Sequence, residues 1–459
     1  MSDGYLLLFG FTLLAWRLSG ARTMAQLAYY LAFTPFVTLD LTDGGLQGAE
    51  DLDSGLVLLK MGLRVGTALP IVILLVRRRS AYGLLSERRF LPALFFVAWA
   101  VLGLIATREP LVPLMRLGEL ALFVATGALL WCDSERSLSL RSQLRVHALA
   151  LVPPIAILAC YAATDPALAM HVNQDGLVRM GSRLINAESL GTIGALLVLW
   201  SSYELKEPRE RLYGWMRERG LPLVVLFLAG ATLILARSRT AMLGASAGEF
   251  LLFSPLLGST RRQWIWSTAC IFGGLVLTVL YSSTIQAWFL RGESVQSLQT
   301  ATGRTELWTH LLDESVPEHP LLGNGYLSLS AQGGFWHAGS YWTNAHNAYL
   351  AALLYTGIPG FVAVVSMLLL VLRSAWKRMH ARAGERAGWP LVFAFGVLAS
   401  ISCTTSFGIC GWPNPLMLFF YGLFPIAVLG LRAPESEEQT DEQDNLLDDD
   451  STKSELAPA

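Results

Sequence analysis

The sequence predicts an all-α, polytopic integral membrane protein with about 12–13 transmembrane helices and one long periplasmic loop. Of its 459 residues, 53% are hydrophobic and 15% are charged, whereas roughly a quarter of the residues in an average soluble domain are charged. Apolar runs of about 16–22 residues recur along the chain, a length that crosses or nearly crosses a hydrocarbon core of ~30 Å. Backbone polar groups must be satisfied within the lipid, so we expect these runs to be helices.

In chain order, the predicted spans are 4–17, 24–40, 56–76, 90–106, 113–131, 146–163, 186–203, 221–236, 240–257, 264–283, 346–372, 389–409 and 414–431. The first run is short, and it either pairs with the second or lies in the membrane interface.

The spans divide the chain into four regions. Residues 1–283 form an N-terminal transmembrane bundle, 284–345 a periplasmic loop with short amphipathic helices, and 346–432 the C-terminal transmembrane helices. The remaining stretch, 433–459, is acidic and nearly free of apolar residues, which is typical of a disordered cytoplasmic tail.

Alternate connections between the spans are rich in arginine and lysine, and this alternation predicts the orientation in the membrane. Basic connections face the cytoplasm, so the intervening ones face outward. The outward set comprises 41–55, 107–112, 164–185, 236–240 and 284–345. The basic residues of the cytoplasmic set are Arg77, Arg78, Arg79, Arg88, Arg89, Arg136, Arg141, Arg145, Lys206, Arg209, Arg211, Arg217, Arg219, Arg261, Arg262, Arg373, Lys377, Arg378, Arg382 and Arg386.

Charge and motif content exclude some classes of function. A formal charge of −1 provides no basic excess for a nucleic-acid partner. The five cysteines form no CxxC pair and are expected to be buried thiols. Neither HExxH nor Walker A occurs on the predicted outer face, so we expect no metal site and no cofactor.

Basic residues at the outer ends of spans are candidates for anion binding. Two arginines, Arg237 and Arg239, lie in a very short turn within ILARSRTAML, at 234–243. Arg237 and Arg239 either form an anion site at the mouth of a cavity or snorkel to lipid headgroups. Lys60 and Arg64 are spaced i,i+4 inside a predicted span and share a helix face. A structural ion pair with an acidic loop residue and a substrate contact both remain open for them.

The long outer loop carries further candidates. Arg304 lies near the start of GRTELWTHLLDE, at 303–314. The residues Leu307, Trp308, Leu311 and Leu312 fall on one face of a predicted amphipathic helix in this stretch. At the start of this helix, the Arg304 side chain either points into the bundle or faces the lipid headgroups. A local ion pair is expected between Arg116 and Glu119, which are spaced i,i+3.

His346 is the strongest candidate for a catalytic base. Asn344 is a plausible N-cap for the following helix, which places His346 in its first turn. The positive end of that helix and nearby arginines disfavour the imidazolium form. A neutral imidazole is what a general base needs near pH 7. His319 and His337 are expected to be structural or interfacial.

Three segments together resemble a known family. GRTELW…HPLLGNGY…AHNAYLAALLYTGIPG resembles the signature of the O-antigen ligase and polymerase superfamily in its long periplasmic loop. SRTAML at 238–243 is similar to the Ser-Arg-Gly segment of that family, with Thr240 in place of glycine. RMGSRLINAESLG at 179–191 loosely resembles its Arg-x-x-Gly…Asn-Pro-Asn segment.

The resemblance implies an inverting, metal-independent glycosyltransferase of the bacterial inner membrane. Such an enzyme moves a glycan from undecaprenyl pyrophosphate to an acceptor hydroxyl at the periplasmic face. By the same resemblance, Arg239 and Arg304 would hold the pyrophosphate, and His346 would deprotonate or orient the hydroxyl. The residues expected to bind substrate are Arg237, Arg179, Arg183, Lys60, Arg64 and Asn347.

The acceptor separates the possibilities within the superfamily. A ligase transfers finished polymer to lipid A core sugar, a polymerase transfers it to another lipid-linked unit, and relatives with larger soluble extensions glycosylate protein. We favour the ligase over the polymerase, and the modest loop disfavours the protein-glycosylating relatives. A transporter or lipid-binding membrane protein is the alternative from another class, but the chain shows no repeat of the kind that transporters often carry.

Overall fold

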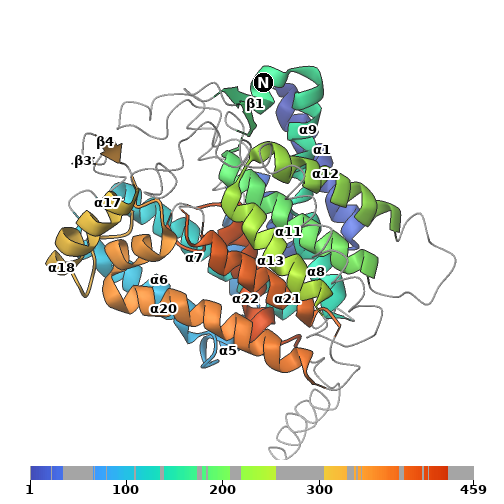
Figure 1. Ribbon diagram of the computed structural model, residues 1–459. Coiled ribbons are helices and arrows are strands. Elements are labelled where there is room, and N and C mark those ends of the chain that lie inside the picture. Colours follow the sequence, from blue (N-terminus) through green and yellow to red (C-terminus); the bar gives the residue numbers. More distant parts are fainter. Residues whose placement is uncertain are drawn as a thin grey trace, which may run out of the picture.

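Figure 1 shows the computed structural model of the chain, in which helices dominate. The all-α, polytopic prediction is confirmed. Lys60, Arg64, Arg183, the predicted span 264–283 and the acidic tail lie outside the described residues. The structure describes residues 2–21, 23–34, 66, 68–78, 80–107, 110–134, 139–172, 178–181, 185–206, 219–254, 304–327, 335–337, 340–342, 344–381, 387–405, 408–411 and 413–432.

The helices of the first half are α1 (Ser2–Ser19), α2 (Met24–Ala32), α5 (Ser80–Leu85), α6 (Leu91–Leu102), α7 (Leu111–Asp133), α8 (Leu140–Leu149), α9 (Val152–Thr164), α10 (Pro166–Ala169) and α11 (Ala187–Lys206). Those of the second half are α12 (Leu221–Ala236), α13 (Arg239–Phe253), α17 (Arg304–His310), α18 (Val316–Glu318), α20 (Ala348–Met379), α21 (Trp389–Ser402) and α22 (Pro415–Leu429).

Several of these helices are apolar enough to belong in a membrane. Within the described residues, three stretches are long and apolar enough to cross one by length and composition: Leu111–Asp133, Leu140–Thr164 and Ala348–Met379. Six shorter apolar helices accompany them, among them Leu221–Ala236 and Trp389–Ser402. These helices support a polytopic arrangement, while the total of about 12–13 spans stays a prediction.

Two short hairpins are the strands of the described part of the chain, and the sequence did not predict them. Strand β1 (Met170–Val172) pairs antiparallel with β2 (Val178–Met180), and β3 (Phe335–His337) pairs with β4 (Ser340–Trp342). Both hairpins fall in connections predicted to face outward. The first positions Arg179 opposite His171.

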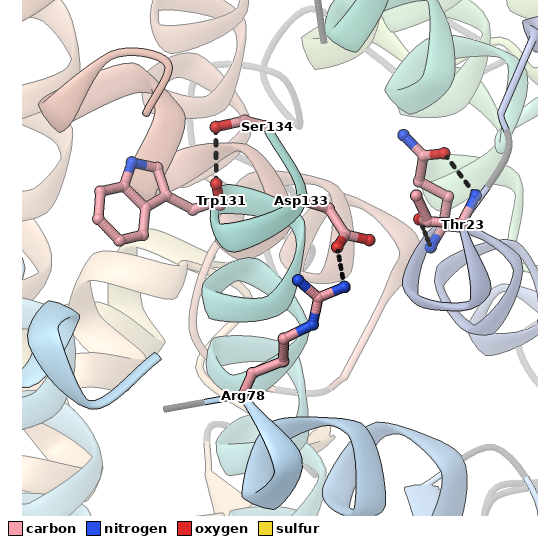
Figure 2. A network of polar contacts seen from close by, with 6 residues as sticks. Thr23, Arg78, Trp131, Asp133 and Ser134 are labelled. Carbon is pink, nitrogen blue, oxygen red and sulfur yellow. Dashed lines mark hydrogen bonds and ion pairs between the residues drawn. The ribbon is translucent and has the colours of Figure 1, made fainter. Parts of the chain in front are cut away.

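Contacts of basic residues gather at one end of the helices. Arg78 donates to Asp133 at 2.9 Å, which joins residues 68–78 to the C-terminus of α7 (Figure 2). Arg141 at the start of α8 donates to Glu204 near the end of α11, also at 2.9 Å. Arg378 near the end of α20 donates to the Ala427 carbonyl of α22 at 3.0 Å. These three arginines, all predicted to be cytoplasmic, therefore lie at a common end of the bundle.

Candidate functional site

Arg304 and His346 come together through the helix that Arg304 begins. The indole N–H of Trp308 in α17 donates to the carbonyl of Ala345 at 2.8 Å. Ala345 directly precedes His346, and the charge of Arg304 acts on the imidazole. Leu307 is fully buried, so one face of α17 anchors it as the sequence predicted. The Trp308 hydrogen bond therefore holds the helix that begins at Arg304 against the residue that precedes His346.

The residues of the predicted apolar face differ in exposure. Leu311 is buried, whereas Leu312 is 48% exposed. The sequence did not predict the π-helical turn at Leu311–Ser315, which changes the number of residues per turn at this point.

His346 lies in a left-handed backbone conformation with φ +48°. The side-chain oxygen of Asn344 accepts the His346 backbone N–H at 2.8 Å and supports this conformation. Positive φ is uncommon for residues other than glycine, and such strain persists where the surroundings fix it. The structure thus holds His346 in one place rather than leaving it in a mobile loop.

The predicted N-cap was wrong by three residues. Asn347, not Asn344, caps α20, and its side-chain oxygen accepts the backbone N–H groups of Tyr349 at 3.0 Å and Leu350 at 3.2 Å. His346 therefore precedes the helix instead of lying in its first turn. The Asn347 oxygen is used for capping, so any substrate contact of this side chain falls to its amide nitrogen.

The surroundings of His346 favour the neutral imidazole that the sequence predicts, but the main cause differs. Burial lowers the pKa of His346 most, and the guanidinium of Arg304 lowers it further, to about 4. Burial disfavours the charged imidazolium, and a neighbouring positive charge has the same direction of effect. At neutral pH the ring is therefore unprotonated and able to accept a proton.

The turn between α12 and α13 carries the other arginines, as predicted. Arg237 closes α12 in a left-handed conformation with φ +50°. Ser238 caps α13, with its hydroxyl oxygen accepting the Ala241 N–H. Arg239 is the first residue of α13. Arg179 of β2 joins them, since its Nε donates to the Ala236 carbonyl at 3.2 Å.

Helix packing places this turn at the same end of the bundle as His346. Helices α13 and α21 lie side by side (Figure 1), and a Cβ on Gly244 would lie 2.3 Å from Leu398 Cδ1. The helices run antiparallel, so the start of α13 and the end of α21 lie on the same side of this contact. At a rise of 1.5 Å per residue, Arg239 and the end of α21 are each about 7 Å from it. The Ala348 N–H donates to the Cys403 carbonyl at 2.9 Å. The contacts therefore put Arg239 and the start of α20 at a similar level.

A break in α20 is a feature that the sequence reasoning missed, since 346–372 was predicted as one span. Gly357 has φ +65° and ψ −170° inside this helix. The freed backbone groups bond to the preceding turn, where the Pro320 carbonyl accepts the Ile358 N–H at 2.8 Å. The Leu354 carbonyl accepts the Asn324 N–H at 2.8 Å. These hydrogen bonds take the place of the helical ones lost at the break, because lipid offers no hydrogen-bond partners to the freed backbone groups.

Close backbone approach explains the glycines in this turn. A Cβ on Gly357 would lie 2.2 Å from the Leu321 carbonyl oxygen, and one on Gly323 would lie 2.5 Å from the Thr356 nitrogen. The turn continues from α18 and contacts the first part of α20, so it connects the two segments that carry Arg304 and His346. TGIPG, with glycine two residues before proline, is the sequence signal that could have revealed the break.

The remaining candidates have simpler outcomes. The ion pair of Arg116 with Glu119 is confirmed, with 3.0 Å between the charged atoms. The backbone of His319 belongs to the turn that docks on α20, where its carbonyl accepts the Gly323 N–H at 2.9 Å. His337 lies in β3. Among the described residues, no group of three or more His, Cys, Asp or Glu side chains is arranged to hold a metal ion.

Comparison with known proteins finds a family model and a protein that match this chain. A family model described as O-antigen ligase matches residues 224–365, a range that contains Arg237, Arg239, Arg304 and His346. The chain is 29% identical over 243 residues to an "O-antigen ligase" of Pseudomonas aeruginosa. The aligned region covers 51% of this chain and 52% of that protein. The chain therefore matches about half the length of this curated relative.

Proposed function

With the resemblance to the O-antigen ligase superfamily confirmed over residues 224–365, we propose that the protein is a membrane glycosyltransferase. It transfers a glycan from undecaprenyl pyrophosphate to an acceptor hydroxyl, with inversion at the anomeric carbon. The observation that carries the proposal is a neutral His346 beside Arg304, at the same end of the bundle as Arg239.

In the proposed reaction, the acceptor oxygen attacks the anomeric carbon while the bond from this carbon to the pyrophosphate oxygen breaks. The acceptor proton passes to His346, whose low pKa keeps it unprotonated beforehand. The departing undecaprenyl pyrophosphate gains negative charge, and the guanidinium groups of Arg304 and Arg239 stabilise it. Guanidinium groups bind phosphate oxygens in a bidentate manner, so these side chains provide the positive charge without a metal ion.

The other arginines extend this site. Arg179 and Arg237 lie with Arg239 around the end of α12, where they are positioned for further phosphate contacts. Lys60, Arg64 and Arg183 stay proposed contacts to donor or acceptor. For Asn347, the substrate contact falls to the amide nitrogen, because the oxygen caps α20.

We place the site at the periplasmic face of the bacterial inner membrane. Arg78, Arg141 and Arg378 make their contacts at the opposite end of the helices from Arg239, and basic ends face the cytoplasm. The donor tail would then lie in the bilayer with its pyrophosphate at the outer headgroup level.

Transfer by the purified protein in lipid nanodiscs tests the proposal. A lipid-linked glycan donor is offered with lipid A core, with a second lipid-linked unit, or with no acceptor. Transfer to lipid A core identifies a ligase, which the name of the Pseudomonas relative favours. Transfer to the second lipid-linked unit identifies the polymerase alternative.

The His346→Ala variant is the matched control, and it should lose transfer while still inserting into the membrane. Normal transfer by this variant would contradict the general-base role. Donor movement across the bilayer without transfer to any acceptor would instead support a transporter.

A further inference from the structure

An apolar groove lies on the flank of the bundle, away from His346. It has a volume of 440 Å³ and is formed by α5, α6, α7 and the helix at Ala68–Arg77. Its α7 side consists of small residues such as Ala121 and Ala125, and Phe90 contributes a bulky ring. Tyr82 and Leu85 at its edge are 55% and 49% exposed, so the groove opens to the surroundings. This volume lies within the usual range of ligand sites.

The groove belongs to the basic end of the bundle. Its α6 wall runs from Phe90, just before the helix, through Leu94 and Val97 to Ala98, and its α7 wall runs from Ala121 to Ala128, toward Asp133. Asp133 is the residue that pairs with Arg78 in Figure 2. Two exposed arginines are close in sequence to its lining, because Arg77 follows the lining residue Leu75 and Arg88 precedes Phe90.

Charge and depth together identify the occupant. An apolar channel with cationic residues at its inner end fits a molecule that has a hydrocarbon chain and an anionic headgroup in the cytoplasmic leaflet. The glycan donor is a poor fit, because its pyrophosphate would sit at the opposite end, beside Arg304. We propose that the groove binds an acyl chain of an anionic phospholipid of the cytoplasmic leaflet, with its phosphate near Arg77 and Arg88.

Lipid retention by the purified full-length protein tests this site. Native mass spectrometry measures the binding of phosphatidylglycerol and of phosphatidylcholine with the same acyl chains. We expect phosphatidylglycerol to bind more tightly. Ala98→Phe fills the groove from α6 and should abolish this binding, whereas Val101→Phe, at an exposed position of the same helix that does not line the groove, should leave it unchanged.

The charge is tested separately. Arg88→Gln should weaken phosphatidylglycerol binding about fivefold, as expected for one cationic residue at a membrane surface. Arg219→Gln, at another predicted cytoplasmic connection, should not. Equal binding of the two lipids, or no effect of Arg88→Gln, would overturn the proposal. The Arg88→Gln measurement tests the proposal even if the Ala98→Phe variant fails to fold.

Competition identifies the occupant independently of catalysis. If a polyprenyl phosphate displaced the phospholipid at equal concentration, the groove would belong to the donor tail and the proposal would be wrong. Glycan transfer should continue in Arg88→Gln, so failure of lipid binding and failure of the proposed enzyme activity are separate results.

Discussion

The Trp308 indole nitrogen lies 2.8 Å from the carbonyl oxygen of Ala345, and this bond attaches the helix of Arg304 to the residue before His346. The two candidate catalytic side chains, Arg304 and His346, come from segments about 40 residues apart in the chain. Their relative position therefore depends on a few specific contacts rather than on neighbouring sequence.

Trp308→Phe should loosen this attachment while keeping an aromatic ring in place. The lost hydrogen bond leaves the Ala345 carbonyl without its donor, at a cost of about 1 kcal/mol in stability. We expect kcat to fall more than KM changes, because the donor still binds while Arg304 is less well placed. Steady-state transfer kinetics measure this, and a rise in KM with unchanged kcat would argue against a positioning role.

Arg304→Gln should move the acid limb of the pH–rate profile. In the native protein the pKa of His346 is about 4, so the base stays unprotonated, and transfer stays near its maximum, until the pH falls toward that value. Removing the guanidinium removes one cause of the lowered pKa, so the pKa rises toward its ordinary value of 6.5 and the limb shifts to higher pH. Burial remains, so the shift should be partial. An unchanged acid limb in an active variant would exclude this electrostatic coupling.

The same pKa has a consequence for stability. Because the folded-state pKa is below the ordinary value, the unfolded chain binds more protons between about pH 6.5 and 4. The contribution of His346 to stability is therefore present above pH 6.5 and is lost as the pH falls through this window. Thermal unfolding of native protein and His346→Ala across the window should show a steeper decline for the native protein.

Arg239→Lys should lower the transfer rate by ~10²-fold if bidentate phosphate capture matters. Lysine keeps the charge but not the planar fork of donors. Arg219→Lys, at a predicted cytoplasmic connection, is the matched control and should transfer normally. Full activity with lysine at 239 would indicate that the native arginine interacts with lipid headgroups instead.

Gly357→Ala should destabilise the protein by about 1–3 kcal/mol or more, the usual cost of a strained backbone conformation. Its φ of +65° disfavours a side chain, and the new Cβ would meet the Leu321 carbonyl oxygen at 2.2 Å. Gly230→Ala is the control, since nothing lies within 4 Å of its Cβ position and alanine favours a helix. Thermal unfolding in detergent compares the two variants. Equal stability would mean that the backbone around Gly357 and Leu321 shifts at little cost to make room for the new Cβ.

The sequence predicted the helices well, because a bilayer requires long apolar runs with internally satisfied backbones. It also paired Arg304 with His346, through motifs and a resemblance rather than through geometry. It could not choose between Asn344 and Asn347 as the cap, because both are good capping residues and local preference does not separate them. Nor could it find the break at Gly357, since apolar composition continues across it and the bonds that stabilise it come from a distant turn.

The Ala348 N–H donates to the carbonyls of Cys403 and Thr405, at 2.9 and 2.8 Å, and this has a consequence for biogenesis. Both acceptors follow α21, so the ribosome makes them well after the segment that carries His346. We expect this end of the site to take shape only once α21 has entered the membrane. A nascent chain released before Cys403 should therefore insert its earlier helices yet leave His346 accessible to chemical modification, and protection of His346 in such a chain would refute this order of assembly.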